Sequence, residues 1–154
     1  NNAERFEDIK KDANLLVITP LKIMGYLVAV FGTLAMIFEV RYFNEHAEQI
    51  YVIRLTATLL SIFILAILNT RFAVRFSVPL VHTLLLTIII SSGLMIYLLP
   101  QTLLVNSQIV GLIIFTSALF LSWTVKNQIL VAIYYNVVFA SAILLNNKAV
   151  YFLG

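Results

Sequence analysis

The chain has 154 residues, of which 62% are hydrophobic and 11% charged, with a formal net charge of +3. Soluble globular domains are about 45–50% apolar and about 25% charged, so this composition excludes an ordinary soluble domain and indicates a chain that lies largely in lipid. The chain has no cysteine, which excludes disulfides, a thiol nucleophile and a thiolate metal site.

Residues 1–19 begin with a polar stretch of mixed charge, and we expect them to form a cytoplasmic tail. Three apolar residues of this tail are spaced as on one helix face: Phe6, Ile9 and Ala13. The spacing predicts a short helix on the membrane surface, and a frayed polar tail is the alternative. Thr19 and Pro20 are typical of a helix start, with a capping hydroxyl followed by a first-turn proline. Because the chain begins with Asn rather than Met, we expect it to be part of a longer protein.

Residues 20–154 are predicted to form one domain, an all-α polytopic transmembrane helix bundle. It contains five complete apolar spans and the start of a sixth, at about 20–40, 50–69, 76–99, 103–123, 128–145 and from about 149 onward. The third span, with 24 residues from Phe76 to Leu99, illustrates that these segments are long enough to cross a membrane. At about 1.5 Å per residue they rise about 36 Å, which is enough to cross a hydrocarbon layer of about 30 Å.

The first span carries a stripe of small residues at helical spacing, Gly25, Ala29 and Gly32. Such a stripe predicts that a neighbouring helix approaches closely. In the third span, Pro79 removes a backbone hydrogen bond and predicts a kink.

The third span also carries a row of polar or irregular residues spaced by four: Arg75, Pro79, Thr83, Thr87 and Ser91. Lipid cannot satisfy free hydrogen-bonding groups, so we expect this face to be turned toward protein or water.

The distribution of Lys and Arg predicts the orientation. With a cytoplasmic N-terminus, seven of the ten basic residues lie inside and three, Arg41, Arg54 and Lys148, lie outside. The positive-inside rule therefore favours a multi-pass membrane protein with its N-terminus in the cytoplasm.

Glu39 at the end of the first span and Arg54 about one turn into the second are charges at membrane depth, and each needs a partner. One interpretation is a structural ion pair between neighbouring helices. A second is that Arg54 lines an outward-facing pocket for an anionic or carbonyl-bearing ligand, because its guanidinium presents a planar fork of donors. Snorkelling of both side chains to the surface is the third.

His82 lies well inside the third span, at about the depth of Ser61, Ser117 and Asn136. We expect a polar layer in the bundle core, with His82 hydrogen-bonded to Asn136 or to a serine hydroxyl. A proton-linked or ligand-sensing role for His82 is the functional alternative. A haem site would need a second buried histidine, and the only other histidine, His46, lies in a loop.

The sequence does not predict an enzyme. Glu45, His46 and Glu48 match no defined metal-site spacing and are typical of a solvated loop. A nucleophile with its base, a glycine-rich phosphate loop and aromatic residues interleaved with basic ones are absent from the sequence. We therefore expect no catalytic residue, no metal, no cofactor and no nucleic-acid partner.

The chain resembles the six-span membrane domain of bacterial signalling receptors, among them quorum-sensing receptor histidine kinases and six-span class III adenylyl cyclases. The resemblance rests on the cytoplasmic tail, the short loops and three stretches: Ile53-Arg54-Leu55-Thr56-Ala57, Trp123-Thr124-Val125-Lys126-Asn127-Gln128, and residues 134–147. It implies a location in the bacterial inner membrane. It also implies that a sixth span returns to the cytoplasm and drives a dimeric kinase or cyclase domain that this sequence does not contain.

We therefore expect a sensory or anchoring domain in the lipid bilayer that binds a ligand and is not itself an enzyme. As a homodimer, it would sense a small apolar or lipid-like molecule near Glu39, Arg54 and Tyr97, with His82 and Asn136 as further ligand-binding candidates. Binding would change the packing around Pro79. A small transporter or channel, using a polar path through His82, Asn136 and the Thr83–Ser91 face, is the alternative, and a structural subunit of a membrane complex is another.

Overall fold

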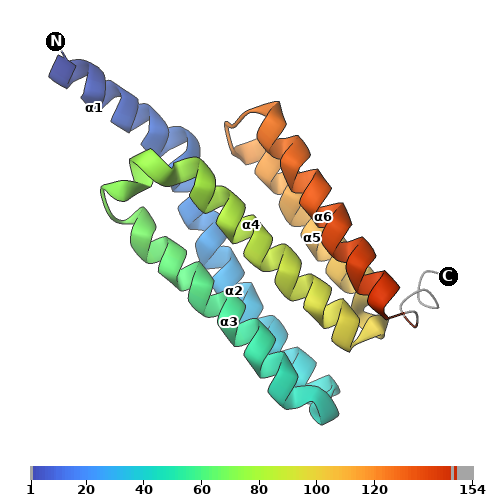
Figure 1. Ribbon diagram of the computed structural model, residues 1–154. Helices are drawn as coiled ribbons and strands as arrows, with labels where there is room; N and C mark the ends of the chain where they lie inside the picture. The colour runs from blue at the N-terminus through green and yellow to red at the C-terminus, as the bar shows by residue number, and fades with distance from the viewer. Residues whose placement is uncertain (1, 147, 149–154) are drawn as a thin grey trace.

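The computed structural model describes residues 2–146 and 148, and all the regular structure in this part of the chain is helical. Helix α1 (Asn2–Ala13) is followed by one π-helical segment (Asn14–Ile18) and by α2 (Thr19–Tyr42), α3 (Ala47–Leu68), α4 (Phe72–Leu98), α5 (Leu103–Phe120) and α6 (Val125–Leu145). Short 3₁₀ turns, Asn44–His46 and Pro100–Thr102, join α2 to α3 and α4 to α5. In Figure 1, α2 to α6 run side by side as a bundle, and α1 extends beyond one end of it.

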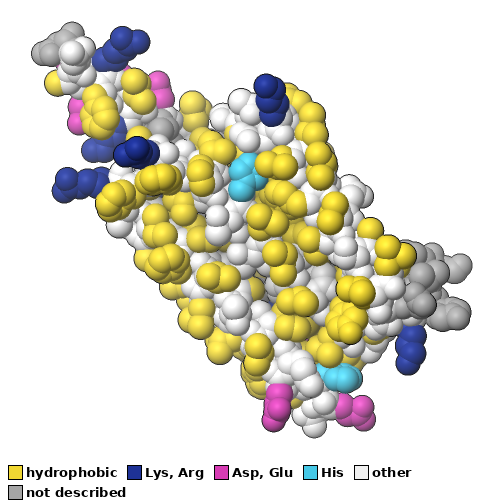
Figure 2. Space-filling view, in the orientation of Figure 1, with side chains coloured by type: hydrophobic (Ala, Val, Ile, Leu, Met, Phe, Trp, Pro, Cys, Tyr) yellow, Lys and Arg dark blue, Asp and Glu magenta, His cyan; other side chains and the backbone are white. Residues whose placement is uncertain are grey.

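Five helical segments of the described chain are long and apolar enough to cross a membrane. They coincide with the five predicted spans, which confirms the all-helical, multi-pass architecture. The predicted start of a sixth span, from about residue 149, lies outside the described residues. Large apolar side chains cover the visible outer surface (Figure 2), and Phe31, Phe63 and Phe115 are each more than 60% exposed. Such a surface suits a bundle whose solvent is hydrocarbon rather than water.

Helix α4 is the centre of the bundle. Twelve of its 27 residues are buried, whereas α3 buries five and α2 three. It packs against α2, α3, α5 and α6, and its buried row of Leu, Ile and Val side chains includes Val81, Leu84, Leu85 and Ile89. Any rearrangement of α4 therefore changes the packing of every other span.

The kink expected from Pro79 is present, three residues before the proline. Phe76 has non-helical backbone angles (φ −114°, ψ 21°) within α4. Proline has no N–H to donate and its ring crowds the carbonyl four residues earlier, so the preceding turn bends away. The first turn of α4, with Arg75, therefore points in a different direction from the long segment that crosses the bundle.

The helix start predicted at Thr19-Pro20 is confirmed, since α2 begins at Thr19 with Pro20 in its first turn, but the predicted capping hydrogen bond is absent. The π-helical turn before Thr19 accommodates the proline, and the Thr19 hydroxyl donates backward to the Asn14 carbonyl (2.7 Å) instead of capping. The carbonyl of Leu16, four residues before Pro20, accepts a hydrogen bond from the Ser122 backbone N–H (3.4 Å). The α5–α6 loop is thereby attached to the beginning of the first span.

The small-residue stripe of the first span does face its neighbour. A Cβ added to Gly25 would lie 2.7 Å from Leu65 Cδ2, and one added to Gly32 would lie 3.4 Å from Thr58 Oγ1. Both contacts are with α3, so the absence of side chains at these glycines allows α2 and α3 to pack closely.

The Arg75–Ser91 row does not lie as a whole against the rest of the described bundle. Arg75, Pro79 and Thr83 are exposed on the outside of α4, whereas Ser91 is buried. The Thr83 hydroxyl donates to the Pro79 carbonyl and the Thr87 hydroxyl to the Thr83 carbonyl, both at 2.8 Å. Because each threonine is satisfied within its own helix, it can face hydrocarbon at little cost.

Candidate functional site

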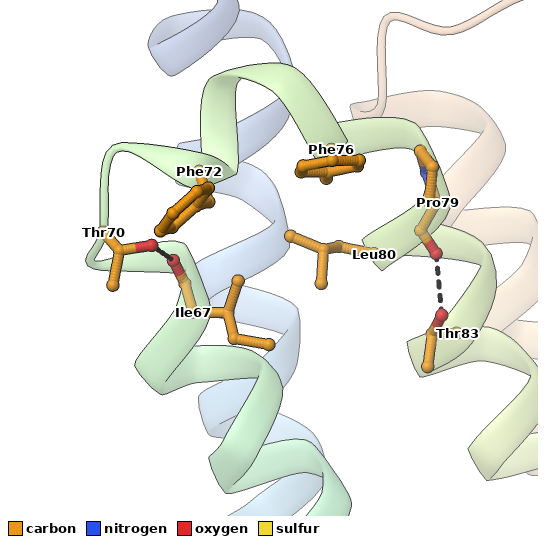
Figure 3. Close-up of a pocket in the computed structure, with 7 residues that line it drawn as sticks. All are labelled: Ile67, Thr70, Phe72, Phe76, Pro79, Leu80 and Thr83. Carbon is orange, nitrogen blue, oxygen red and sulfur yellow. Dashed lines mark hydrogen bonds between the residues drawn. The ribbon is translucent and has the colours of Figure 1, made fainter.

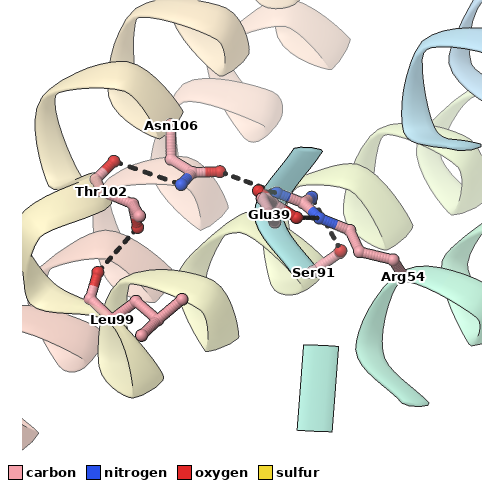
Figure 4. A network of polar contacts seen from close by, with 6 residues as sticks. All are labelled: Glu39, Arg54, Ser91, Leu99, Thr102 and Asn106. Atoms are coloured by element: carbon pink, nitrogen blue, oxygen red, sulfur yellow. Dashed lines mark hydrogen bonds and ion pairs between the residues drawn. The ribbon is translucent and has the colours of Figure 1, made fainter. Parts of the chain in front are cut away.

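Arg54 of α3 and Glu39 of α2 form a bidentate ion pair (Figure 4). Arg54 Nε donates to Glu39 Oε2 at 2.7 Å and Nη2 donates to Oε1 at 2.5 Å. The two side chains are 13% and 16% exposed. The parallel arrangement is the strongest geometry that an arginine and a carboxylate form, and it neutralises both charges inside the bundle.

The same guanidinium reaches two further helices. Nη1 donates to the Ser91 hydroxyl of α4 and Nη2 donates to Asn106 Oδ1 of α5, each at 3.3 Å. Ser91 is 5% exposed and Asn106 3%. The Asn106 amide in turn donates to the Thr102 carbonyl (3.2 Å), which fixes which of its ends faces Arg54.

We call Glu39, Arg54, Ser91 and Asn106 the arginine network. It joins one residue from each of α2, α3, α4 and α5. The hydrogen bonds from Arg54 to Glu39 of α2 are short, and those to Ser91 of α4 and Asn106 of α5 are long. Four of the five N–H groups of the guanidinium are engaged, which matches the structural ion-pair interpretation and leaves little of the fork free for a ligand.

Tyr97, the third residue of the expected ligand site, takes no part in the arginine network. It lies six residues beyond Ser91 on α4, which is about 240° around the helix, and its side chain is 49% exposed. Its backbone carbonyl accepts a hydrogen bond from Asn146 Nδ2 (2.7 Å), so this position connects α4 with the end of α6. The structure therefore brings Glu39 and Arg54 together and leaves Tyr97 apart.

A second polar cluster surrounds His82, which lies nine residues before Ser91 on α4. Its Nδ1 lies 3.3 Å from the Tyr134 hydroxyl and its Nε2 lies 3.2 Å from Asn127 Oδ1. The Trp123 ring packs on the imidazole with centroids 4.9 Å apart. A neutral imidazole that donates from Nε2 to Asn127 and accepts from Tyr134 at Nδ1 satisfies both contacts.

Trp123 is itself held in place. Its indole N–H donates to Gln128 Oε1 (3.0 Å), and the Gln128 amide donates to the Ile114 carbonyl of α5 (3.3 Å). The cluster therefore connects α4 to α5, to α6 and to the loop between them.

The expected partnership of His82 with Asn136 or a serine is wrong. Asn136 is exposed and donates to the Ala132 carbonyl of its own helix (2.8 Å). Ser61 and Ser117 likewise donate to carbonyls of their own helices. The polar path that a channel through His82 and Asn136 would require is therefore not assembled among these residues.

Sequence reasoning missed Asn106, Asn127 and Gln128. Asn106 is an amide in the first turns of an apolar span, close to Gln108, and a buried amide in lipid requires a partner; this was the available signal. The partners of His82 carried a weaker signal, because Asn127 and Gln128 are at the start of α6, where polar residues are also expected to face water.

Apolar grooves lie on the surface of the described bundle, and two of them are lined by no residue of the arginine network. One, of about 440 Å³, lies at the α3–α4 turn, and the other, of about 400 Å³, lies between α2 and α3. Within residues 2–146 and 148, no group of three His, Cys, Asp or Glu side chains is placed to hold a metal ion.

No family model, curated protein or solved structure matches this chain.

Proposed function

We propose that this multi-pass bundle is the sensory or anchoring domain of a signalling receptor of the bacterial inner membrane. In this proposal it works as a homodimer with a cytoplasmic N-terminus, and it relays the binding of a small apolar or lipid-like molecule to a kinase or cyclase domain outside this sequence. The observation that carries the proposal is the arginine network, which ties α4 and α5 to the α2–α3 pair through one guanidinium.

The hydrogen bonds of the arginine network differ in length, and the longer ones are those that a ligand would replace. The Glu39 bonds of Arg54 are 2.5 and 2.7 Å long, whereas its bonds to Ser91 and Asn106 are 3.3 Å long. A carbonyl oxygen of a bound molecule that accepts from the guanidinium replaces the two long bonds more readily than the ion pair. Loss of these bonds frees α4 and α5 from the α2–α3 pair while the buried charges stay paired.

Once α4 is released from the network, it can bend at the kink at Phe76. The network holds α4 at Ser91, and the non-helical residue lies at the other end of the same helix. A ligand shifts such an equilibrium only by its difference in affinity for the two packings, so the long bonds to Ser91 and Asn106 set the size of the response.

The distribution of charge supports the proposed orientation. Most Lys and Arg side chains on the face shown in Figure 2 lie at the end that carries α1. That end also holds the α3–α4 turn, with Arg71 and Arg75, and the α5–α6 loop, followed by Lys126. The positive-inside rule assigns this end to the cytoplasm.

The first test is the reading frame that encodes the chain. Sequencing beyond Gly154 is expected to show a sixth span followed by a kinase or cyclase domain. A stop codon directly after Gly154, or a continuation into further spans without such a domain, contradicts the receptor proposal.

The second test measures output. In the full-length protein in proteoliposomes, Ser91→Ala removes one long bond of Arg54 and is expected to shift basal kinase or cyclase activity at least twofold. Ser141→Ala is the matched control, because the Ser141 hydroxyl is exposed and bonded to the Val137 carbonyl of its own helix. Unchanged basal activity in Ser91→Ala, with an unchanged thermal midpoint, contradicts a signalling role for the network.

A further inference from the structure

The groove at the α3–α4 turn is lined mostly by apolar side chains (Figure 3). Its lining residues come from the end of α3 and the kinked beginning of α4: Ile67, Thr70, Phe72, Phe76, Pro79, Leu80 and Thr83. The turn residue Thr70 joins two spans, so this end of the groove lies at the level of the lipid headgroups. Leu80 and Thr83 lie past the kink, where α4 enters the hydrocarbon.

The groove lies at the kink of α4. The non-helical backbone at Phe76 directs the first turn of α4 away from the axis of its longer segment, and the groove lies between that turn and the end of α3. Its walls are almost entirely hydrocarbon side chains. The Thr70 and Thr83 hydroxyls already donate to the Ile67 and Pro79 carbonyls, so neither hydroxyl has a free proton to donate to a polar solute in the groove.

Two arginines flank the headgroup end of the groove. Arg71 stands in the sequence between the lining residues Thr70 and Phe72, and Arg75 precedes the lining residue Phe76. Both are exposed, and within the described chain neither forms an ion pair with a carboxylate. The Arg75 guanidinium carbon lies 5.7 Å from the centroid of the Phe76 ring, so this charge is positioned against the groove wall.

We propose that the groove binds one anionic phospholipid, with an acyl chain along Phe76, Leu80 and Thr83 and the phosphate between Arg71 and Arg75. Charge complementarity selects the occupant. An apolar slot that opens at headgroup level beside two unpaired guanidinium groups fits a molecule with a hydrocarbon tail and an anionic head. The proposal does not depend on a signalling role for the bundle.

The test uses the full chain in phosphatidylcholine nanodiscs with a phosphatidylglycerol probe that carries a photoreactive diazirine on one acyl chain. Mass spectrometry is expected to locate the cross-link within residues 67–83. Unlabelled phosphatidylglycerol should suppress it, and additional phosphatidylcholine should not. Equal suppression by both lipids, or labelling spread evenly over all spans, overturns the proposal.

Two variants separate the headgroup from the acyl chain. The double substitution Arg71→Gln/Arg75→Gln is expected to weaken competition by phosphatidylglycerol roughly fivefold for each arginine, as about 1 kcal/mol per basic side chain at an anionic surface predicts. Lys126→Gln, which removes an exposed basic residue at the same end of the bundle, is the control and should leave competition unchanged. If the arginine variant matches this control, the headgroup assignment is wrong.

Thr83→Trp fills the groove from an exposed position and is expected to abolish the cross-link within residues 67–83. Ser141→Trp, at an exposed position of α6, is the control for adding an indole to the lipid-facing surface. Undiminished labelling in Thr83→Trp overturns the assignment of the acyl chain to this groove.

Discussion

Glu39 and Arg54 meet through two parallel hydrogen bonds, Nε to Oε2 at 2.7 Å and Nη2 to Oε1 at 2.5 Å, across the contact between α2 and α3. Among the described residues, Arg54 forms an ion pair only with Glu39, and Glu39 only with Arg54. Breaking the pair from one side therefore leaves a charge inside the bundle.

Arg54→Met is expected to destabilise the protein by about 3 kcal/mol, since it leaves the Glu39 carboxylate buried and unpaired. The double variant Glu39→Gln/Arg54→Met should recover most of this loss because it removes both charges. Unfolding in mixed micelles titrated with SDS measures the difference. Arg41→Met, which removes an exposed arginine at the same end of the bundle, is the control and should change stability by less than about 0.5 kcal/mol. Equal effects at the two arginines would contradict the network.

Gly93→Val is expected to cost about 1–3 kcal/mol by forcing α4 and α6 apart. A Cβ at Gly93 would already lie 2.6 Å from Val138 Cγ1, and the short valine side chain has little freedom to withdraw. Gly111 on α5 provides the matched site, because a Cβ there meets nothing within 4 Å. The same SDS titration should place Gly111→Val close to the wild-type protein, and a similar loss in both variants would show that the α4–α6 contact is not as close as described.

Asn127→Ala and Tyr134→Phe each remove one hydrogen bond of His82, and each is expected to cost about 0.6–1.7 kcal/mol, the range of hydrogen bonds between membrane helices. Trp123 is the only tryptophan and packs on the imidazole, so its emission should change in both variants. Asn136→Ala is the control, since that amide bonds its own helix. A change of Trp123 emission in Asn136→Ala, with none in Asn127→Ala, would contradict these contacts and indicate that His82 pairs with Asn136 instead.

Much of the architecture is predictable because lipid imposes it. Long apolar stretches separated by short polar turns leave few alternatives to a helical bundle, and the positions of Pro79 and Gly25 are sufficient to predict a kink and a close contact. The pairing of Glu39 with Arg54 is also predictable, since the two charges lie at similar depth on consecutive spans.

The partners of His82 and the role of Asn106 depend on helix rotation, which the sequence specifies poorly. Depth alone places His82 beside Asn136, but the rotation of α6 exposes Asn136 and directs Tyr134 and Asn127 toward the imidazole. The spans are apolar on all sides, so no strong periodicity marks which face is inside. The Thr83 and Thr87 hydroxyls are uninformative for a related reason: each bonds its own helix, so neither reports which way that helix faces.

The alternation of five membrane crossings is the claim on which everything else depends, and labelling of introduced cysteines tests it most directly. The chain has no cysteine, so a single substitution provides a unique target. With a membrane-impermeant maleimide on intact spheroplasts, Asn44→Cys and Gln101→Cys should react, whereas Thr70→Cys and Lys126→Cys should react only after the membrane is opened. Equal labelling of Asn44→Cys and Thr70→Cys in intact spheroplasts would show that α3 does not cross the bilayer, and would contradict the account.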